Sequence, residues 1–235
     1  MVFIPVRDDN ALRRIDFQWV TLGLIAANVA IFAATIAGIP EEVLLSFAIV
    51  PRELLDEGIR GAATYPHKFN FIDVREIWTL ATYMFMHGNI MHLVGNMLFL
   101  WVFGDNVEDA MGHVRYLVFY VLCGTCGALF HTFMVPGSEI PLIGASGAVA
   151  GIITAYLILY PRVQVWILVF RILPLKLPVF LVLGSWIALQ FAMPLFSRAD
   201  QISWFAHVGG ILTGAVLVFV LKRPGVRVFQ GLGSA

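Results

Sequence analysis

Long runs of apolar residues, separated by charged and turn-forming residues, recur along the chain and limit what it can fold into. Six runs lie near residues 19–38, 79–103, 115–135, 144–160, 177–196 and 203–221. A helix needs about 20 mostly apolar residues to cross the hydrocarbon core of a bilayer. The chain is 60% hydrophobic and only 13% charged, whereas soluble domains are about one quarter charged. We therefore expect an all-α, polytopic membrane protein with six transmembrane helices in a single domain over residues 1–235.

The distribution of positive charge predicts how these spans are oriented. An even number of spans places both termini on one side of the membrane, and that side carries ten of the fifteen Lys and Arg residues. Because short cytoplasmic segments are enriched in Lys and Arg, we expect both termini in the cytoplasm. The protein would be an integral, multi-pass protein of the cell membrane, with residues 39–78 and 136–142 outside the cytoplasm. The mixed composition of 39–78 favours a structured or interfacial loop. The formal net charge is zero, so composition favours no nucleic-acid partner.

Four polar residues lie inside the expected spans, where polar side chains are costly and often functional. Ser146 opens the fourth span, His207 lies early in the sixth, and His92 and Asn96 lie in the second. These three spans run in the same direction. At about 1.5 Å rise per residue, Ser146 and His207 fall within one turn of the same depth, near the extracytoplasmic face. His92 and Asn96 are four residues apart and share one helix face. His87 and His92 are five residues apart, about 140° around the helix, so we do not expect them to converge on a metal.

Small residues at helical spacing accompany the serine and the histidine. Gly147 and Gly151 are four residues apart and directly follow Ser146. Gly210 and Gly214 are also four residues apart and share a helix face with His207. Glycines at this spacing let two helix backbones approach closely. A nucleophile and its base need heavy atoms about 2.6–3.2 Å apart, so we expect the fourth and sixth spans to pack tightly. Backbone N–H groups at the start of the fourth span would suit an oxyanion.

Other interpretations apply to isolated polar residues. A lone Ser in a membrane helix usually bonds to its own backbone, and a lone His or Asn often bridges helices. We interpret Asn28 and Gln190 as such bridges. His67, His113 and His131 are expected in loops or at span ends. The four residues above differ because position, helix face and chemistry all bring them together.

The sequence also disfavours several other chemistries. It contains no H-E-x-x-H motif, which zinc metalloproteases of that type use. Asp105 and Asp109 are expected in the loop after the second span, so they would not form an intramembrane aspartate pair. Cys123 and Cys126 fall inside an expected span, where small residues at helix contacts are a better interpretation than a redox motif.

Several stretches together match one known pattern. They read "HGNIMHLVGN" at 87–96, "FGDNVEDAMG" at 103–112, "GASGAVAG" at 144–151 and "AHVGGILTG" at 206–214. Their order and spacing within six apolar runs resemble the rhomboid family of intramembrane serine proteases. The resemblance extends over roughly residues 19–221 and implies a six-helix rhomboid-like bundle.

The resemblance also implies roles for individual residues. Ser146 would be the nucleophile and His207 the general base, while His92, Asn96 and the backbone N–H of Ser146 would bind the oxyanion. No metal and no organic cofactor would be needed. The substrates would be membrane-anchored proteins, cut in or near their transmembrane segments within the lipid bilayer.

The sequence departs from the family pattern at two places. Many members have Trp-Arg where this chain has Trp78 and Thr79. Some members place an aromatic residue under the histidine at the position of Ala150, so what orients the imidazole of His207 is open. Two functions other than proteolysis are alternatives for a chain of this composition. A non-catalytic rhomboid-like binding or escort protein would usually lack the Ser or the His, and a transporter would be expected to show inverted repeats or broken helices. The sequence does not predict the physiological substrate, the cleavage-site preference, the gating element or the oligomeric state.

Overall fold

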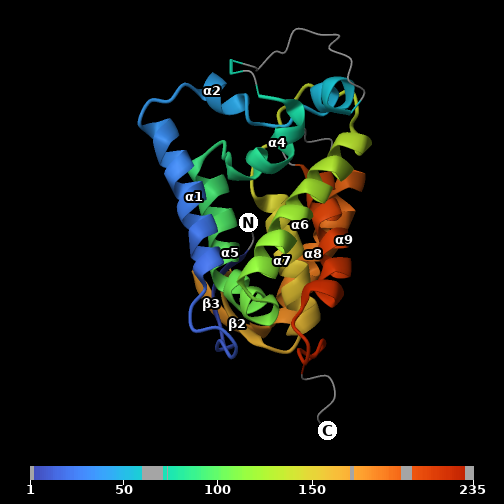
Figure 1. Cartoon of the computed structure of the whole chain (residues 1–235). Helices are drawn as coiled ribbons and strands as arrows, with labels where there is room; N and C mark the ends of the chain where they lie inside the picture. The colour runs from blue at the N-terminus through green and yellow to red at the C-terminus, as the bar shows by residue number, and fades with distance from the viewer. Residues whose placement is uncertain (1–2, 60–70, 73, 170–171, 197–202, 231–235) are drawn as a thin grey trace.

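A computed structural model describes residues 3–59, 71–72, 74–169, 172–196 and 203–230. Within this part, five helices are long and apolar enough to cross a membrane: α1 (Trp19–Ile36), α5 (Ile90–Met111), α6 (His113–Met134), α8 (Val179–Phe196) and α9 (Trp204–Leu221). A shorter apolar helix, α7 (Ser146–Leu159), lies among them (Figure 1). The expected helical, polytopic fold is confirmed. Because α7 has only 14 residues, the count of six spans stays a prediction.

The short helix α7 is buried among the other helices, and small residues make this possible. A Cβ atom added to Gly210 of α9 would lie 2.0 Å from the carbonyl oxygen of Gly147. One turn further along, a Cβ on Gly214 would lie 2.6 Å from the carbonyl oxygen of Gly151. Backbone therefore meets backbone along this contact, with no room for a side chain. The close packing of the fourth and sixth spans expected from the glycine spacing is confirmed.

The segment between α1 and α5 is folded. It contains α2 (Glu41–Leu45), α3 (Pro51–Glu53), the π-helical turn η1 (Leu54–Ile59), α4 (Glu76–Thr82) and the 3₁₀ turn η2 (Tyr83–Phe85). Ile49 pairs with Leu142 in an isolated antiparallel bridge, and the Thr82 hydroxyl donates to the carbonyl of Phe47 at 2.8 Å. The described part of 39–78 is thus a structured loop, as expected; residues 60–70 and 73 lie outside the description.

The second span differs from its expected bounds of 79–103. Helix α5 begins only at Ile90, because the Asn89 side chain accepts a hydrogen bond from the backbone N–H of His92 at 2.9 Å and caps the helix. The preceding apolar residues form α4 and η2 instead. At its other end α5 continues to Met111. The prediction that Asp105 and Asp109 lie in a loop after this span was therefore wrong, since both lie in the last two turns of α5.

Two carboxylates explain why α5 stays helical through this acidic end. The Glu108 carboxylate accepts hydrogen bonds from the backbone N–H groups of Val20 and Thr21, at 3.0 and 2.8 Å. Helix α1 has no side-chain cap of its own, so this fully buried carboxylate supplies one. Similarly, Oδ1 of Asp109 accepts from three consecutive backbone N–H groups, those of Arg13, Arg14 and Ile15. The acidic residues thus fix the start of α1 against the end of α5.

A small antiparallel sheet, absent from the prediction, covers one end of the bundle. Its strands are β1 (Phe3–Asp8), β2 (Gln164–Val169) and β3 (Leu173–Pro178), in the order β1-β2-β3. In β2, Val165 and Ile167 alternate with less buried residues and face the core. The expected fifth span at 177–196 accordingly begins slightly later, with α8 at Val179.

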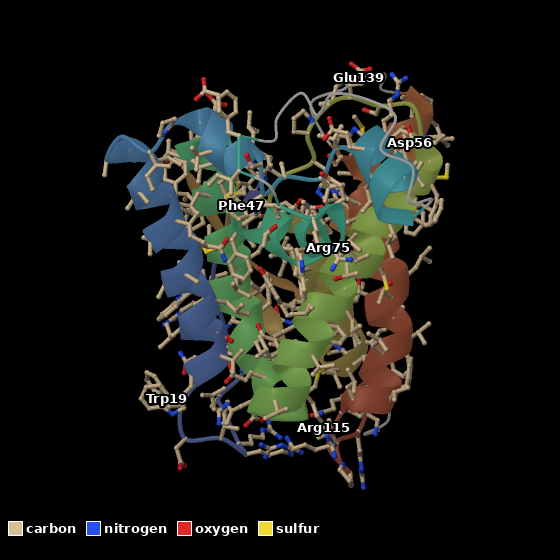
Figure 2. The ribbon with its side chains drawn as sticks, turned by 45° about the horizontal axis from the view of Figure 1, so that its top comes forward. Trp19, Phe47, Asp56, Arg75, Arg115 and Glu139 are labelled. Atoms are coloured by element: carbon tan, nitrogen blue, oxygen red, sulfur yellow. The ribbon has the colours of Figure 1, made fainter. Side chains whose placement is uncertain are left out.

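The two ends of the bundle carry different segments. Strands β2 and β3 and the C-terminal end of α9 lie at one end, and α2 and α4 lie at the other (Figure 1). Figure 2 places Trp19 and Arg115 at the first end and Asp56 and Glu139 at the second. This separation matches the order in which the expected spans alternate across a membrane.

Candidate active site

A tight turn sets the position of Ser146 at the start of α7. Gly144, two residues earlier, has φ +115°, which side-chain-bearing residues rarely adopt. Its N–H donates to the carbonyl of Tyr83 at 3.0 Å. A Cβ atom on Gly144 would also lie 2.6 Å from Nε2 of His92. Glycine is thus required here both for the turn and for the approach of an imidazole to the residues beside Ser146.

Ser146 and His207 form a hydrogen-bonded pair between two helices. The Oγ atom of Ser146 lies 2.8 Å from Nε2 of His207. Ser146 is the first residue of α7, and His207 lies in the first turn of α9. The glycine contact between these helices begins at the next residue, Gly147. The short interhelical distance therefore holds the two side chains within the range that nucleophile activation needs.

The second ring nitrogen of His207, Nδ1, contacts a side chain of α8. Nδ1 of His207 lies 2.8 Å from Oε1 of Gln190. The rings of Trp186 and Trp204 each lie 6.0 Å from the imidazole, the second edge-on. Ala150, which carries no aromatic group, is fully buried. Gln190 does bridge two helices, as the sequence suggested, and its partner is the histidine of the pair.

His92 and Asn96 lie beside the turn that precedes Ser146. A Cβ atom on Gly144 would lie 2.6 Å from Nε2 of His92 and 3.8 Å from Nδ2 of Asn96. Both residues are on α5, one turn apart, and Asn96 is buried. The structure thus places His92 and Asn96 beside the Gly144 turn that leads into the Ser146–His207 pair.

His87 belongs to the same cluster, which the sequence reasoning missed. It lies before α5, so the angle of about 140° from His92, which assumed one continuous helix, does not apply. Nε2 of His87 lies 2.9 Å from Nδ2 of Asn96, and its ring centroid lies 4.9 Å from that of His92. Burial, and next the neighbouring His92, lower the pKa of His87 to about 4. At neutral pH the ring is uncharged, so Nε2 can accept a hydrogen bond from the Asn96 amide. The Gly88-Asn89 pair, a helix-stop and capping signal, could have revealed this break.

The remaining residues considered in the sequence lie elsewhere. His113 begins α6, with Nδ1 2.5 Å from Oε1 of Glu108, and His131 lies in the last turn of α6. His67 lies outside the described residues. A Cβ atom on Gly151 would lie 2.5 Å from Sγ of Cys123, so this cysteine packs at a helix contact, as interpreted.

The fold and the site together define a polytopic helical membrane protein with a Ser–His pair between two of its helices. The family model for the Rhomboid domain matches residues 74–224, which include all the residues of this site. The chain belongs to the rhomboid family.

Individual relatives extend the match beyond that domain. RHOMBOID-like protein 1 of Arabidopsis thaliana is 30% identical over 226 residues, covering 88% of this chain and 54% of the relative. RHOMBOID-like protein 6, mitochondrial, of the same plant is 34% identical over 146 residues, covering 62% of this chain and 44% of the relative. Rhomboid protein 1, mitochondrial, of Saccharomyces cerevisiae is 28% identical over 143 residues, covering 59% of this chain and 40% of the relative. The chain spans about half the length of the curated relatives it matches, 44% and 54% for the two plant proteins.

Proposed function

We propose that this protein is an intramembrane serine endopeptidase that hydrolyses peptide bonds in or near the transmembrane segments of membrane-anchored proteins. The observation that carries the proposal is the distance of 2.8 Å between Oγ of Ser146 and Nε2 of His207. Membership of the rhomboid family supports a protease-type function.

In the first step, Nε2 of His207 takes the hydroxyl proton while Oγ of Ser146 attacks the peptide carbonyl carbon. The carbonyl oxygen becomes an oxyanion. His92, the free N–H of the Asn96 amide and the backbone N–H of Ser146 are the donors available to bind it. The other N–H of the Asn96 amide donates to Nε2 of His87, with 2.9 Å between the two nitrogen atoms, and this bond fixes the direction of the remaining N–H.

The intermediate then collapses and completes the reaction. The C–N bond breaks, and His207 gives its proton to the departing amine, leaving an ester on Ser146. Water, deprotonated by His207, hydrolyses this ester and restores the serine. As the ester breaks, His207 returns the proton taken from water to Oγ of Ser146. All of these proton transfers use Nε2 of His207, so no further acid or base is required.

The position of the pair supports membrane proteins as substrates. Ser146 is the first residue of α7 and His207 lies in the first turn of α9, and the turn before Ser146 bonds to the carbonyl of Tyr83, directly after α4, at 3.0 Å. A transmembrane segment could reach them by unwinding near its own end, where its peptide bonds lose their helical hydrogen bonds. Water could reach the same end from the adjoining aqueous phase.

The test is cleavage of a single-span reporter protein by the purified protein in proteoliposomes. We expect the wild type to cut the reporter, and Ser146→Ala and His207→Ala to be folded but inactive. Ser185→Ala is the matched control, because that hydroxyl bonds to a backbone carbonyl of its own helix, Val182, at 3.0 Å. A wild type that binds the reporter without cutting it would instead support the non-catalytic escort function.

We further propose that both termini face the cytoplasm of the cell membrane, so that the end carrying α2 and α4 faces outward. The excess of Lys and Arg in the terminal segments and connected loops supports this orientation. Cysteines introduced singly at position 41, which is exposed at the start of α2, and at position 230, in a Cys123- and Cys126-free background, would test it. An impermeant thiol reagent should modify only the first in intact cells; the reverse pattern would refute the orientation.

A further inference from the structure

We propose that Gln190 is the positioning residue of the Ser146–His207 pair. Its side-chain oxygen holds the imidazole in the tautomer that carries its proton on Nδ1, which leaves Nε2 free to take the serine proton. This inference rests on the proposed function, and it gives this chain a neutral amide in the place where many serine hydrolases use a carboxylate.

The second hydrogen bond of Gln190 fixes the direction of its amide. Nε2 of Gln190 donates to the backbone carbonyl of Trp186 at 3.1 Å, on the preceding turn of α8. The carbonyl oxygen of Trp186 can only accept a hydrogen bond, so its partner must be the NH₂ group and not Oε1 of Gln190. Oε1 therefore faces His207, at 2.8 Å from Nδ1. An oxygen without a proton can only accept, and Nδ1 must be the donor.

The opposite tautomer would conflict with both neighbours of the ring. A proton on Nε2 would leave that nitrogen unable to accept from Ser146. The lone pair of Nδ1 would then face the lone pairs of Oε1 of Gln190. Gln190 is 3% exposed, so little water is available to relieve that contact. One buried amide thus selects the tautomer that general-base chemistry needs.

The other groups around His207 do not offer this bond. Trp186 and Trp204 present aromatic rings to the imidazole. The titratable side chains that act on it electrostatically are His92 of α5 and His131 of α6, and neither has a described hydrogen bond to Nδ1. Among the buried side chains of α8, which are Val179, Val182, Leu183 and Gln190, only the last is polar. On the described part of the chain, Gln190 is thus the side chain that bonds to Nδ1.

The position of Gln190 also couples the pair to α8. Helix α9 carries His207, while Gln190 and Trp186 come from α8. Any outward displacement of α8 would lengthen the bond of 2.8 Å to Nδ1 without moving Ser146. The tautomer of His207 therefore depends on the place of a helix that contributes no reacting atom.

Two substitutions separate positioning from packing. Gln190→Met keeps the length and most of the volume of the side chain but removes the acceptor. Gln190→Glu keeps an oxygen at the same place. Leu189→Met, at a 49% exposed neighbouring position, is the matched control. For each variant, kcat and KM for the reporter in proteoliposomes would be measured across pH, together with thermal unfolding in detergent.

We expect Gln190→Met to lower kcat on the order of 10²-fold, the cost of a mispositioned catalytic group, with KM and the unfolding midpoint near wild type. Gln190→Glu should recover most of the lost kcat. It should also move the acidic limb of the pH–rate profile to higher pH, because a carboxylate stabilises the imidazolium. Wild-type kcat in Gln190→Met, a Gln190→Glu variant as impaired as Gln190→Met, or an unmoved acidic limb would each overturn the inference. A wild type that does not cut the reporter would overturn the proposed function itself, which keeps the two failures distinguishable.

Discussion

Adding a single methyl group at Gly210 should separate the two helices that carry the Ser–His pair. In Gly210→Ala the new carbon would lie 2.0 Å from the carbonyl oxygen of Gly147. Contacts of Cβ atoms under 3.0 Å essentially do not occur, and the neighbour here is backbone that cannot rotate away. Helices α7 and α9 must therefore move apart by about 1 Å, the difference between the two distances.

That separation would lengthen the hydrogen bond between Ser146 and His207. Gly147 follows Ser146 in the chain, and Gly210 lies three residues after His207. Adding about 1 Å to the observed 2.8 Å between Oγ and Nε2 gives about 3.8 Å, beyond the range of a hydrogen bond. A misplacement of this size costs on the order of 10² in rate. We expect kcat to fall by that factor although no reacting group is changed.

The assay is turnover of the single-span reporter in proteoliposomes, together with the unfolding midpoint in detergent. Gly184→Ala of α8 is the control, because a Cβ there would have no heavy atom within 4 Å. It should leave turnover unchanged, since Ala suits a helix interior better than Gly. A Gly210→Ala variant that stays folded and turns over within threefold of wild type would show that the contact of α7 with α9 does not set the geometry of the pair.

Three further predictions concern the neighbours of the pair and the sheet. His92→Ala and Asn96→Ala should each lower kcat by about 10²–10³, the cost of one oxyanion donor, with KM little changed because the charge exists only in the transition state; a change in KM alone contradicts this role. His87→Ala should also lower kcat, because Asn96 loses the acceptor 2.9 Å from its amide nitrogen, whereas wild-type kinetics would show that His87 does not position it. In β1, burial raises the pKa of Asp8 from 3.8 to about 6, although a hydrogen bond from Tyr156 opposes the shift. The folded state therefore binds this proton more tightly, and its contribution to stability, complete below pH 3.8, is lost as pH rises through about 6. The unfolding midpoint of Asp8→Asn, relative to wild type, should rise across that window; a constant difference would refute the assignment.

The sequence was sufficient to predict those features that follow from a single physical property of one residue type. Apolar runs predicted the helical membrane fold, and Gly147 and Gly210 predicted which helices meet, because only missing side chains allow such an approach. Span order alone predicted that Ser146 and His207 lie at a similar depth, and their side chains are hydrogen-bonded. Each of these inferences needed only helix geometry and the cost of polar groups in hydrocarbon.

Features that depend on tertiary contacts could not be predicted in this way. The helical state of Asp105 and Asp109 depends on α5 continuing to Met111, where distant backbone amides stabilise its acidic end. The sheet depends on β1 meeting a hairpin more than 150 residues away in sequence. Gln190 carried the signal of a helix bridge, but its partner could be identified only once α8 and α9 were placed side by side. His87 was misplaced because the apolar residues before it resemble a continuation of the helix.

The most direct test of the account is the site of reaction with a fluorophosphonate probe. The purified wild type would be treated at neutral pH, digested, and the modified residue located by mass spectrometry. Nε2 of His207 lies 2.8 Å from Oγ of Ser146, and in the proposed mechanism it takes the serine proton. We therefore expect a phosphonylated Ser146, with the adduct absent from Ser146→Ala and strongly reduced in His207→Ala. A folded wild type that carries no adduct on Ser146, or equal labelling of His207→Ala, would contradict the claim that this pair is a catalytic dyad.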